Sequence, residues 1–209
     1  DRAGINQNLM PDYLLLFGDG SYDFKNRISG NTNFVPAYQS SESLSPTASY
    51  VSDDYYGLLD DNESESVFDL IDAGIGRLVV KNTTEAQNAV NKIKHYYDKS
   101  TMGPWRNYNT FIGDDEDGNI HMIQANDSVA RIIETKFKKY NVDKILFDAY
   151  KQQVNAGGQR YPDVNIAIDR RVDLGTLMMT YIGHGGELGW AHERVLEVSQ
   201  INKWTNFDN

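Results

Sequence analysis

The sequence predicts an α/β fold in which helices cover a mostly parallel sheet. Short continuous apolar runs, typical of strands buried on both faces, alternate along the chain with segments of helical period. This alternation is typical of parallel strands joined by helical crossovers. The chain has 209 residues, of which 40% are hydrophobic and 24% charged. That composition supports a sizeable core in one or two domains.

The expected strands are short apolar runs that end at glycines or turns, at residues 13–17, 75–80, 109–113, 144–147 and 174–182. Asn82 followed by Glu85 forms a capping-box pattern, so a helix is expected from about residue 83. Its apolar face contains Ala86, Val90, Ile93 and Tyr97. A second amphipathic helix is expected over 121–139, with an inner face of Met122, Ala125, Val129, Ile132, Ile133 and Phe137. Further helices are expected at 165–171 and 198–204.

Residues 18–70 are rich in Ser, Asn, Asp, Gly and Tyr and show little periodicity. A loop of this length is unusual in a compact domain and indicates either a functional segment or short strands. The candidate strands lie at 34–38, 55–59 and 67–70.

Composition excludes several classes of function. With 20 basic and 30 acidic residues, the net charge is -10, which disfavours nucleic acid as a partner. The absence of cysteine excludes disulfides, Cys-ligated metal sites and a cysteine nucleophile within these 209 residues. No run reaches the roughly 18 apolar residues of a membrane helix. Both ends look cut, so a portion of a longer protein is expected.

Three turns follow predicted strands, at residues 18–20, 114–118 and 183–186, and reactive groups of parallel sheets gather at such carboxyl ends. His184 stands out because Gly183 and Gly185 flank it, which lets a substrate backbone approach and leaves the Gly185 N–H free to face a ligand. An imidazole can act as a general base near neutral pH. The alternative is a histidine without a role in a glycine-rich turn.

The acidic turn at 114–117 allows several interpretations. It can be a solvated loop, a loose calcium site, or the source of an acid that orients His184 as in a catalytic triad. Its spacing does not fit an EF-hand. A metal hydrolase using Asp19 and these acids is a weaker hypothesis, because no second histidine stands at ligand spacing. Asp19 is expected to hold its turn, and His192 to lie at the surface.

Four segments resemble the gingipain-type cysteine peptidases. YIGHGGE at 181–187, followed by Trp190-Ala191, is similar to the histidine motif of that family. LLLFGD at 14–19, SDDYYG at 52–57 and IGRL at 75–78 resemble three further blocks in the same order. GDGSYD at 18–23 and GDDEDG at 113–118 are most similar to the sortase branch, which serves type IX secretion in Bacteroidetes.

The resemblance implies a caspase-like α/β fold with a Cys–His pair, truncated here at the C-terminus before the last core strands. His184 corresponds to the general base, the Gly185 N–H to part of the oxyanion hole, and Glu116 to the orienting acid, with Asp115 as the alternative. The family's cysteine follows after one more helix and strand, so it is expected beyond residue 209. Residues 1–209 would then be the N-terminal portion of a peptidase domain, inactive by itself.

The resemblance also implies a polypeptide substrate, namely secreted cargo with a C-terminal signal, and a place on the extracellular side of the outer membrane with secretion partners there. No cofactor is expected, although structural calcium fits the acidic turn. The alternative function is a non-catalytic surface or scaffold module on the same caspase-like fold, and the missing cysteine is its support.

Overall fold

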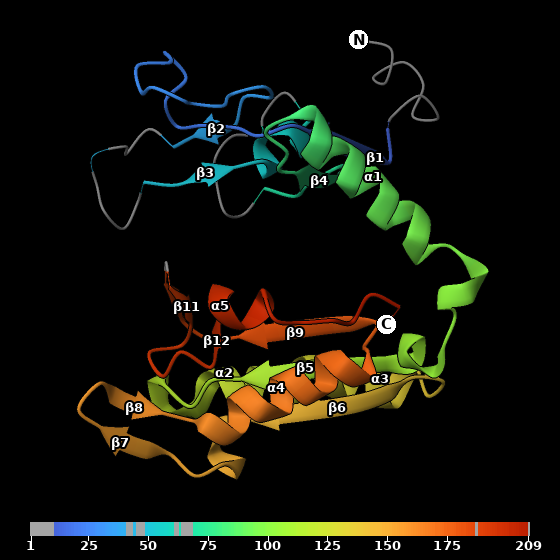
Figure 1. Cartoon of the computed structure of the whole chain (residues 1–209), viewed down its shortest axis with the longest axis vertical. Coiled ribbons are helices and arrows are strands. Elements are labelled where there is room, and N and C mark those ends of the chain that lie inside the picture. Colours follow the sequence, from blue (N-terminus) through green and yellow to red (C-terminus); the bar gives the residue numbers. More distant parts are fainter. Residues whose placement is uncertain are drawn as a thin grey trace. The chain divides into compact units, whose positions relative to one another are not determined.

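The computed structural model describes residues 11–40, 44, 49–60, 63, 69–186 and 188–208. The chain divides into two compact units, Asp1–His95 and Tyr96–Asn209, and each is described by itself (Figure 1). Within the described part of the chain, no helix has the length and apolar character needed to span a membrane.

The first unit contains two small sheets. β1 (Tyr13–Phe17) pairs in parallel with β4 (Gly74–Leu78), and β2 (Tyr38–Gln39) pairs antiparallel with β3 (Val51–Ser52). The prediction of β1 is confirmed, and β4 lies within two residues of its predicted bounds. The strand predicted at 34–38 is wrong, because only its last residue belongs to a strand. The strand predicted at 55–59 is also wrong, because Asp54–Gly57 forms a 3₁₀ helix. Residues 67 and 68 of the third candidate lie outside the described residues, and 69–70 are irregular.

The guanidinium of Arg77 joins separate segments of the first unit. It donates two hydrogen bonds of 2.7 Å to the carboxylate of Asp53, from Nε and from Nη2. It also donates to the carbonyl oxygens of Gly18 at 2.9 Å, Val35 at 2.8 Å and Pro36 at 3.1 Å. The hydrogen bonds to Asp53 raise the pKa of Arg77 above its ordinary value. Planar donors in a fixed fork allow one side chain to bind all four groups.

Helix α1 (Thr83–Tyr96) begins where the capping-box pattern predicted it. The Asn82 side chain accepts from the Glu85 N–H at 2.9 Å, and the Glu85 carboxylate accepts in return from the Asn82 side-chain amide and the Lys81 N–H, both at 2.8 Å. α1 contains no buried residue, so the packing of its apolar face on a sheet stays a prediction.

The second unit is built on a three-stranded sheet in the order β6–β5–β9, with all strands parallel (Figure 1). Its strands are β5 (Tyr108–Gly113), β6 (Asn141–Leu146) and β9 (Met178–Ile182). This confirms the expected parallel sheet. β9 begins later than predicted because α4 (Pro162–Leu174) continues to Leu174, three residues beyond its predicted end.

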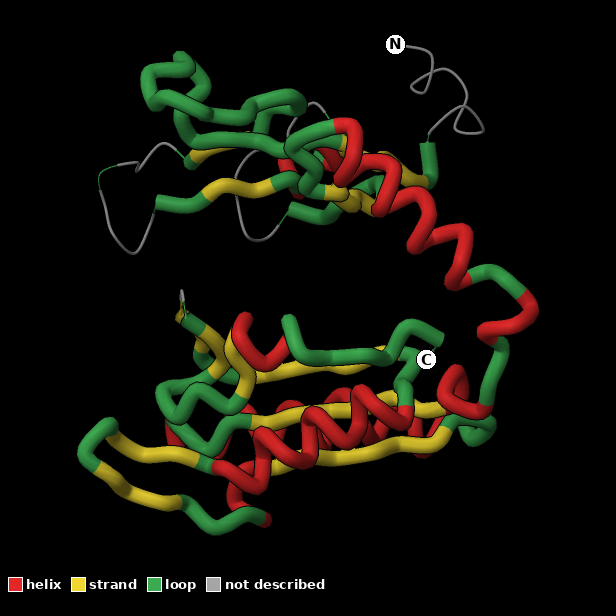
Figure 2. Tube along the Cα trace, viewed as in Figure 1, coloured by secondary structure: helices red, strands yellow, loops and turns green. Residues whose placement is uncertain are grey.

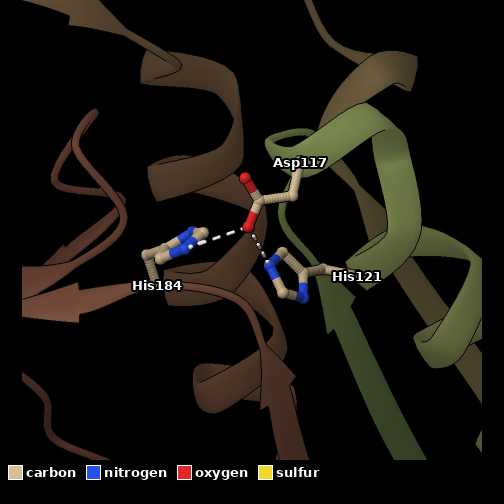
Figure 3. Close-up of side chains that lie close together, drawn as sticks. All are labelled: Asp117, His121 and His184. Atoms are coloured by element: carbon tan, nitrogen blue, oxygen red, sulfur yellow. Dashed lines mark ion pairs between the residues drawn. The ribbon is translucent and has the colours of Figure 1, made fainter.

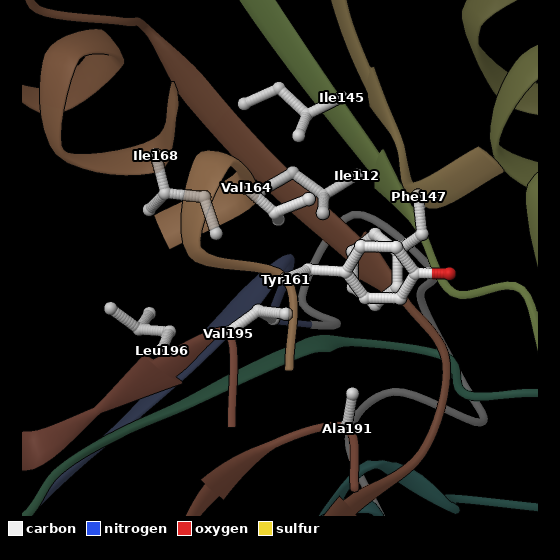
Figure 4. Packing of buried hydrophobic residues seen from close by; sticks show 9 residues of the cluster. All are labelled: Ile112, Ile145, Phe147, Tyr161, Val164, Ile168, Ala191, Val195 and Leu196. Carbon is white, nitrogen blue, oxygen red and sulfur yellow. The ribbon is translucent and has the colours of Figure 1, made fainter. Parts of the chain in front are cut away.

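Successive side chains of β5 are buried on opposite faces of this sheet. Phe111 and Ile112 are both 0% exposed. Phe111 packs with Ala125 and Ala130 of the helical stretch 120–136, and Ile112 packs with Val164 and Ile168 of α4. Figure 2 shows these helices beside the sheet, and Figure 4 shows the Ile112 cluster, which extends to Phe147, Tyr161 and Val195. The central strand is thus enclosed from both sides.

The stretch 120–136 is one run of helix with a π-helical middle. It consists of α2 (Ile120–Ile123), the π segment Gln124–Ala130 and α3 (Arg131–Lys136). The helix ends at Lys136, three residues before its predicted end at 139, so Phe137 lies beyond it and is 51% exposed. The predicted inner face is correct at Met122 and Ala125, which are buried, but wrong at Ile132, which is 46% exposed. A π turn holds more residues than an α turn, so the buried face shifts along the sequence beyond it, and Ala130 is buried instead.

Several short elements complete the second unit. β7 (Gln153–Asn155) and β8 (Gly158–Arg160) form a hairpin that the sequence analysis did not predict. β10 (Gly185–Gly186), β11 (Gly189–Trp190) and β12 (Leu196–Glu197) form an antiparallel sheet that begins within the predicted histidine turn at 183–186. α5 (Val198–Ile201) is shorter than the predicted 198–204.

Truncation of Ile168 should test the core on the α4 side of the sheet. Ile168→Ala should lower the free energy of unfolding by about 2–5 kcal/mol, the usual cost of removing a buried isoleucine. Ile166→Ala, in the same helix but 63% exposed, should cost less than about 0.5 kcal/mol. Urea unfolding followed by circular dichroism measures both, and equal losses would contradict the packing described here.

Candidate active site

The pairing of β5 with β9 brings two turns together at one rim of the sheet. Gly113 and Ile182 are partners in register, so Asp114 follows one strand where Gly183 and His184 follow the other. Asp114 donates its N–H to the Ile182 carbonyl at 3.1 Å. Its carboxylate is fully buried and accepts from the His184 N–H at 3.1 Å and from the Glu116 N–H at 3.3 Å. Asp114 therefore fastens the acidic turn to the histidine turn.

Gly183 is required at this rim by space. A Cβ at this position would overlap the Asp114 side chain and the hydroxyl of Tyr181. That hydroxyl lies 2.6 Å from the His184 carbonyl and 3.2 Å from Asp114 Oδ2, within reach of both acceptors. Burial, and next the neighbouring Asp114, raise the pKa of Tyr181, so it stays protonated as a donor.

The imidazole of His184 lies among three carboxylates of the acidic turn. Nδ1 lies 3.3 Å from Glu116 Oε2 and 3.6 Å from Asp114 Oδ2. Nε2, on the other side of the ring, lies 3.3 Å from Asp117 Oδ2. The expected closeness of Glu116 to His184 is confirmed. The His184 side chain is 45% exposed and open to a ligand.

Asp115, the alternative to Glu116, serves a different contact. Its Oδ2 accepts a 2.6 Å hydrogen bond from the hydroxyl of Tyr161, a residue of the buried Ile112 cluster. Burial, with the bond to Asp115 next, raises the pKa of Tyr161. The expectation that Asp115 could take the place of Glu116 at His184 is therefore wrong in this structure, because Asp115 points toward the interior.

Glu116 contacts a second histidine. Its Oε1 lies 2.7 Å from Nδ1 of His192, while its Oε2 faces His184. The His192 side chain is 79% exposed, so its expected surface position is confirmed. The hydrogen bond to Glu116, and next the charge of that carboxylate, raise the pKa of His192 above its ordinary 6.5.

His121, which the sequence analysis placed only at the start of a helix, also lies at the site (Figure 3). Its ring centroid is 5.0 Å from that of His184, with the planes at 84°. The expectation that no second histidine is placed to share a metal ion is thus wrong, because the fold brings His121 beside His184. Asp117 and His121 are four residues apart, and that i,i+4 spacing was the signal that could have paired them.

Gly185 opens β10 beside His184 and is exposed, and a Cβ placed on it would lie 3.9 Å from the Gly189 carbonyl oxygen. A hollow of about 500 Å³ adjoins it. The lining is mainly apolar and comes from β10, β11, β12 and α5, including Trp190, Leu196, Val198 and Ile201. Trp190 stacks on Tyr181, with ring centroids 4.6 Å apart. The exposed Gly185 thus borders both His184 and an apolar hollow.

Comparison with known proteins identifies the family and the fold of the chain. The model of peptidase family C25 matches residues 3–209. The chain belongs to peptidase family C25. A crystal structure of the Arg-specific cysteine proteinase gingipain R (RGPB) matches with a TM-score of 0.61 and 19% identity, over 98% of this chain and 40% of that chain. No curated protein sequence matches significantly.

The C25 match confirms the gingipain-type family expected from the histidine motif, and the structural match confirms the caspase-like α/β fold. The chain spans 40% of the length of the gingipain structure. Its 209 residues contain no cysteine, although C25 is a family of cysteine peptidases.

Asp19 holds its own turn in the first unit. Its backbone carbonyl accepts from the N–H groups of Phe34 and Val35, and its carboxylate accepts from the Thr32 hydroxyl. Among the residues that the structure describes, Asp19 belongs to no cluster of possible metal ligands. The weaker hypothesis of a metal hydrolase using Asp19 gains no support from these contacts.

Glu193 is a buried acid that sequence reasoning missed. It is 2% exposed, and its Oε2 has no hydrogen-bond partner within the described part of the chain. Desolvation is the main cause that raises its pKa, and the charge of Asp115 adds to it. A glutamate between His192 and Arg194 reads as a surface residue, so the sequence carries no signal for its burial.

Neutralising Glu193 should stabilise the fold at neutral pH. The pKa of Glu193 is raised above its ordinary 4.5 in the folded state. The folded protein therefore has its full free energy of unfolding at pH values below 4.5, and part of it is lost as the pH rises through the pKa of the folded state. Glu193→Gln should therefore gain about 1 kcal/mol near pH 7 and nothing near pH 4. Denaturant titrations at both pH values, with Glu197→Gln as the more exposed control, measure this. A loss of stability at every pH would contradict it.

The His192–Glu116 contact should be visible by NMR. The His192 pKa should lie above 6.5 in the wild-type chain and return toward that value in Glu116→Gln, because the charged acceptor is gone. Proton-detected titration of the imidazole resonances measures both, with His95 as the internal control. An unchanged His192 titration in the variant would rule out the contact in solution.

Proposed function

We propose that this chain carries the general-base half of the active site of a cysteine endopeptidase, with His184 as the base and the nucleophilic cysteine supplied by sequence beyond residue 209. The observation that carries the proposal is the 3.3 Å contact between His184 Nδ1 and Glu116 Oε2 in a chain of family C25. A carboxylate on Nδ1 fixes the tautomer and orientation of an imidazole and leaves Nε2 for proton transfer.

The chemistry follows from these positions. The cysteine thiol passes its proton to His184 Nε2, and the thiolate attacks the scissile carbonyl carbon. The Gly185 N–H and the N–H of the cysteine hold the resulting oxyanion. His184 then gives the proton to the leaving amine, the C–N bond breaks, and a thioester remains for attack by water or an amine. The Asp117 carboxylate lies 3.3 Å from Nε2, so it must move away before the thiol can contact this nitrogen.

The finer role that we propose is that of the type IX secretion sortase PorU. Such an enzyme cleaves C-terminal sorting signals from secreted cargo and joins the new terminus to a surface acceptor. Support comes from the segments GDGSYD at 18–23 and GDDEDG at 113–118. The proposal places the protein on the outer face of the outer membrane, together with secretion partners.

A non-catalytic module on the same fold is the second candidate, and the absence of cysteine from these 209 residues favours it. The natural sequence that follows residue 209 separates the two candidates. A cysteine after one further helix and strand supports the peptidase, whereas a chain without one supports the module.

The 209-residue chain should turn over no peptide, because it contains no thiol. In the longer natural protein, His184→Ala should lower kcat by about 10²–10⁴-fold, the range that general acid–base catalysis contributes. Glu116→Gln should lower it less, and Asp115→Asn, whose carboxylate faces Tyr161, should lower it least.

Peptide hydrolysis by rigorously purified protein measures these effects, and mass analysis with and without an added amine separates hydrolysis from sortase transfer. Turnover by the 209-residue chain that is lost in its His184→Ala form would contradict the cysteine-peptidase assignment, because that turnover would depend on His184 without any thiol. Hydrolysis without amine transfer would remove the sortase role and keep the peptidase.

A further inference from the structure

Three possible metal ligands converge beside the candidate active site (Figure 3). Asp117 comes from the acidic turn, His121 from the start of the helical stretch 120–136, and His184 from the turn after β9. Asp117 Oδ2 lies 3.3 Å from His184 Nε2 and 3.5 Å from His121 Nε2. The three ligand atoms all lie within 4.8 Å of one another.

Within the part of the chain that the structure describes, hydrogen bonding leaves both ring nitrogens of His121 unsatisfied in this arrangement. A charged N–H···O pair closes to about 2.7–2.9 Å, and both contacts of Asp117 are longer. Nδ1 and Nε2 of His121 are buried, and neither has a hydrogen-bond partner among the described residues. A buried polar atom left unpaired costs about 1–3 kcal/mol, so a group that binds His121 Nε2 would recover that energy.

The distances fit coordination instead. Zn²⁺ binds imidazole nitrogen and carboxylate oxygen at about 2.0–2.2 Å in a tetrahedron, which places the ligand atoms roughly 3.3–3.5 Å apart. Asp117 Oδ2 has that spacing to both histidine nitrogens. Two imidazoles and one carboxylate suit zinc-type ions, whereas calcium requires oxygen ligands. The carboxylate of Glu116 on Nδ1 of His184 turns the Nε2 lone pair toward the ion, as second-shell acids of zinc sites do.

The backbone holds Asp117 in this position. Asp117, Gly118 and Asn119 follow one another with φ values of 53°, 67° and 68°, in the left-handed region. Asp117 and Asn119 are among the residue types that tolerate this region, and the reversal turns the chain between the acidic turn and the helix that carries His121. The turn thereby brings the Asp117 carboxylate, which is 63% exposed, next to both imidazoles.

We propose that Asp117, His121 and His184 bind one divalent transition-metal ion of the zinc class, with the fourth coordination position open to water. The ion uses the Nε2 lone pair of His184. If His184 is the general base, as the proposed function requires, bound metal blocks proton transfer. Metal binding itself does not depend on that function.

The binding test uses the 209-residue chain, which has no thiol to compete for the metal. After treatment with a chelator, Co²⁺ and Zn²⁺ are titrated in separate experiments, with calorimetry and the visible absorption of Co²⁺ as readouts. We expect one ion per chain, an intense tetrahedral Co²⁺ spectrum and displacement by Zn²⁺ but not by Ca²⁺. His121→Ala and Asp117→Asn should each weaken binding at least tenfold, whereas His95→Ala and Asp115→Asn should leave it unchanged.

Binding weaker than about 1 mM, or binding that His121→Ala does not alter, would overturn the proposal. Because His121→Ala removes a side chain that is only 20% exposed, the wild-type chain gives a second readout that does not depend on the fold of the variant. Zn²⁺ should shift the imidazole ¹H–¹⁵N signals of His121 and His184 and leave those of His95 in place. If Zn²⁺ shifts only the signals of other residues, the proposed metal site is also overturned. In the longer natural protein, Zn²⁺ should inhibit turnover, and the Zn²⁺ concentration that halves turnover should rise at least tenfold in His121→Ala, each protein being compared with its own metal-free rate. If the metal binds to the three residues but does not inhibit turnover, that result counts against the proposed function and not against the metal site.

Discussion

The buried carboxylate of Asp114 is the constraint on which the rim of the sheet depends. A charged group without exposure is costly unless hydrogen bonds satisfy it. Here the donors are the backbone N–H groups of His184 and Glu116, which belong to two different turns. The charge is therefore satisfied when both turns are in place, and the in-register pairing of β5 with β9 places them there.

From this anchor the acidic turn gives each carboxylate a different environment. Asp115 points inward to Tyr161, Glu116 lies between His184 and His192, and Asp117 reaches the other side of the His184 ring. Neighbouring acids with separate partners can perform separate tasks, as acid and base pairs of enzymes do when their surroundings differ. The run of like charges is thus an ordered set of contacts and not a uniformly solvated loop.

Periodicity and strand order were sufficient to predict the parallel sheet, the start of α1 and the position of His184 at a carboxyl rim. The sequence also predicted that Glu116 lies near that histidine. It could not predict the π segment at Gln124–Ala130, because a change of helical period leaves no mark in the residue types, and so it misplaced Ile132. It also misplaced Phe137, because the helix ends at Lys136. His121 and Glu193 were missed because their surroundings come from segments distant in the sequence.

Arg77 has a consequence for how the first unit opens. Its guanidinium binds a carbonyl that follows β1, two carbonyls before β2 and a carboxylate after β3, contacts that span up to 59 residues of sequence. Loss of that one side chain from its position releases all of these segments together. The described residues around Gly18, Val35, Pro36 and Asp53 are therefore expected to exchange their amide hydrogens as one cooperative unit, rather than segment by segment.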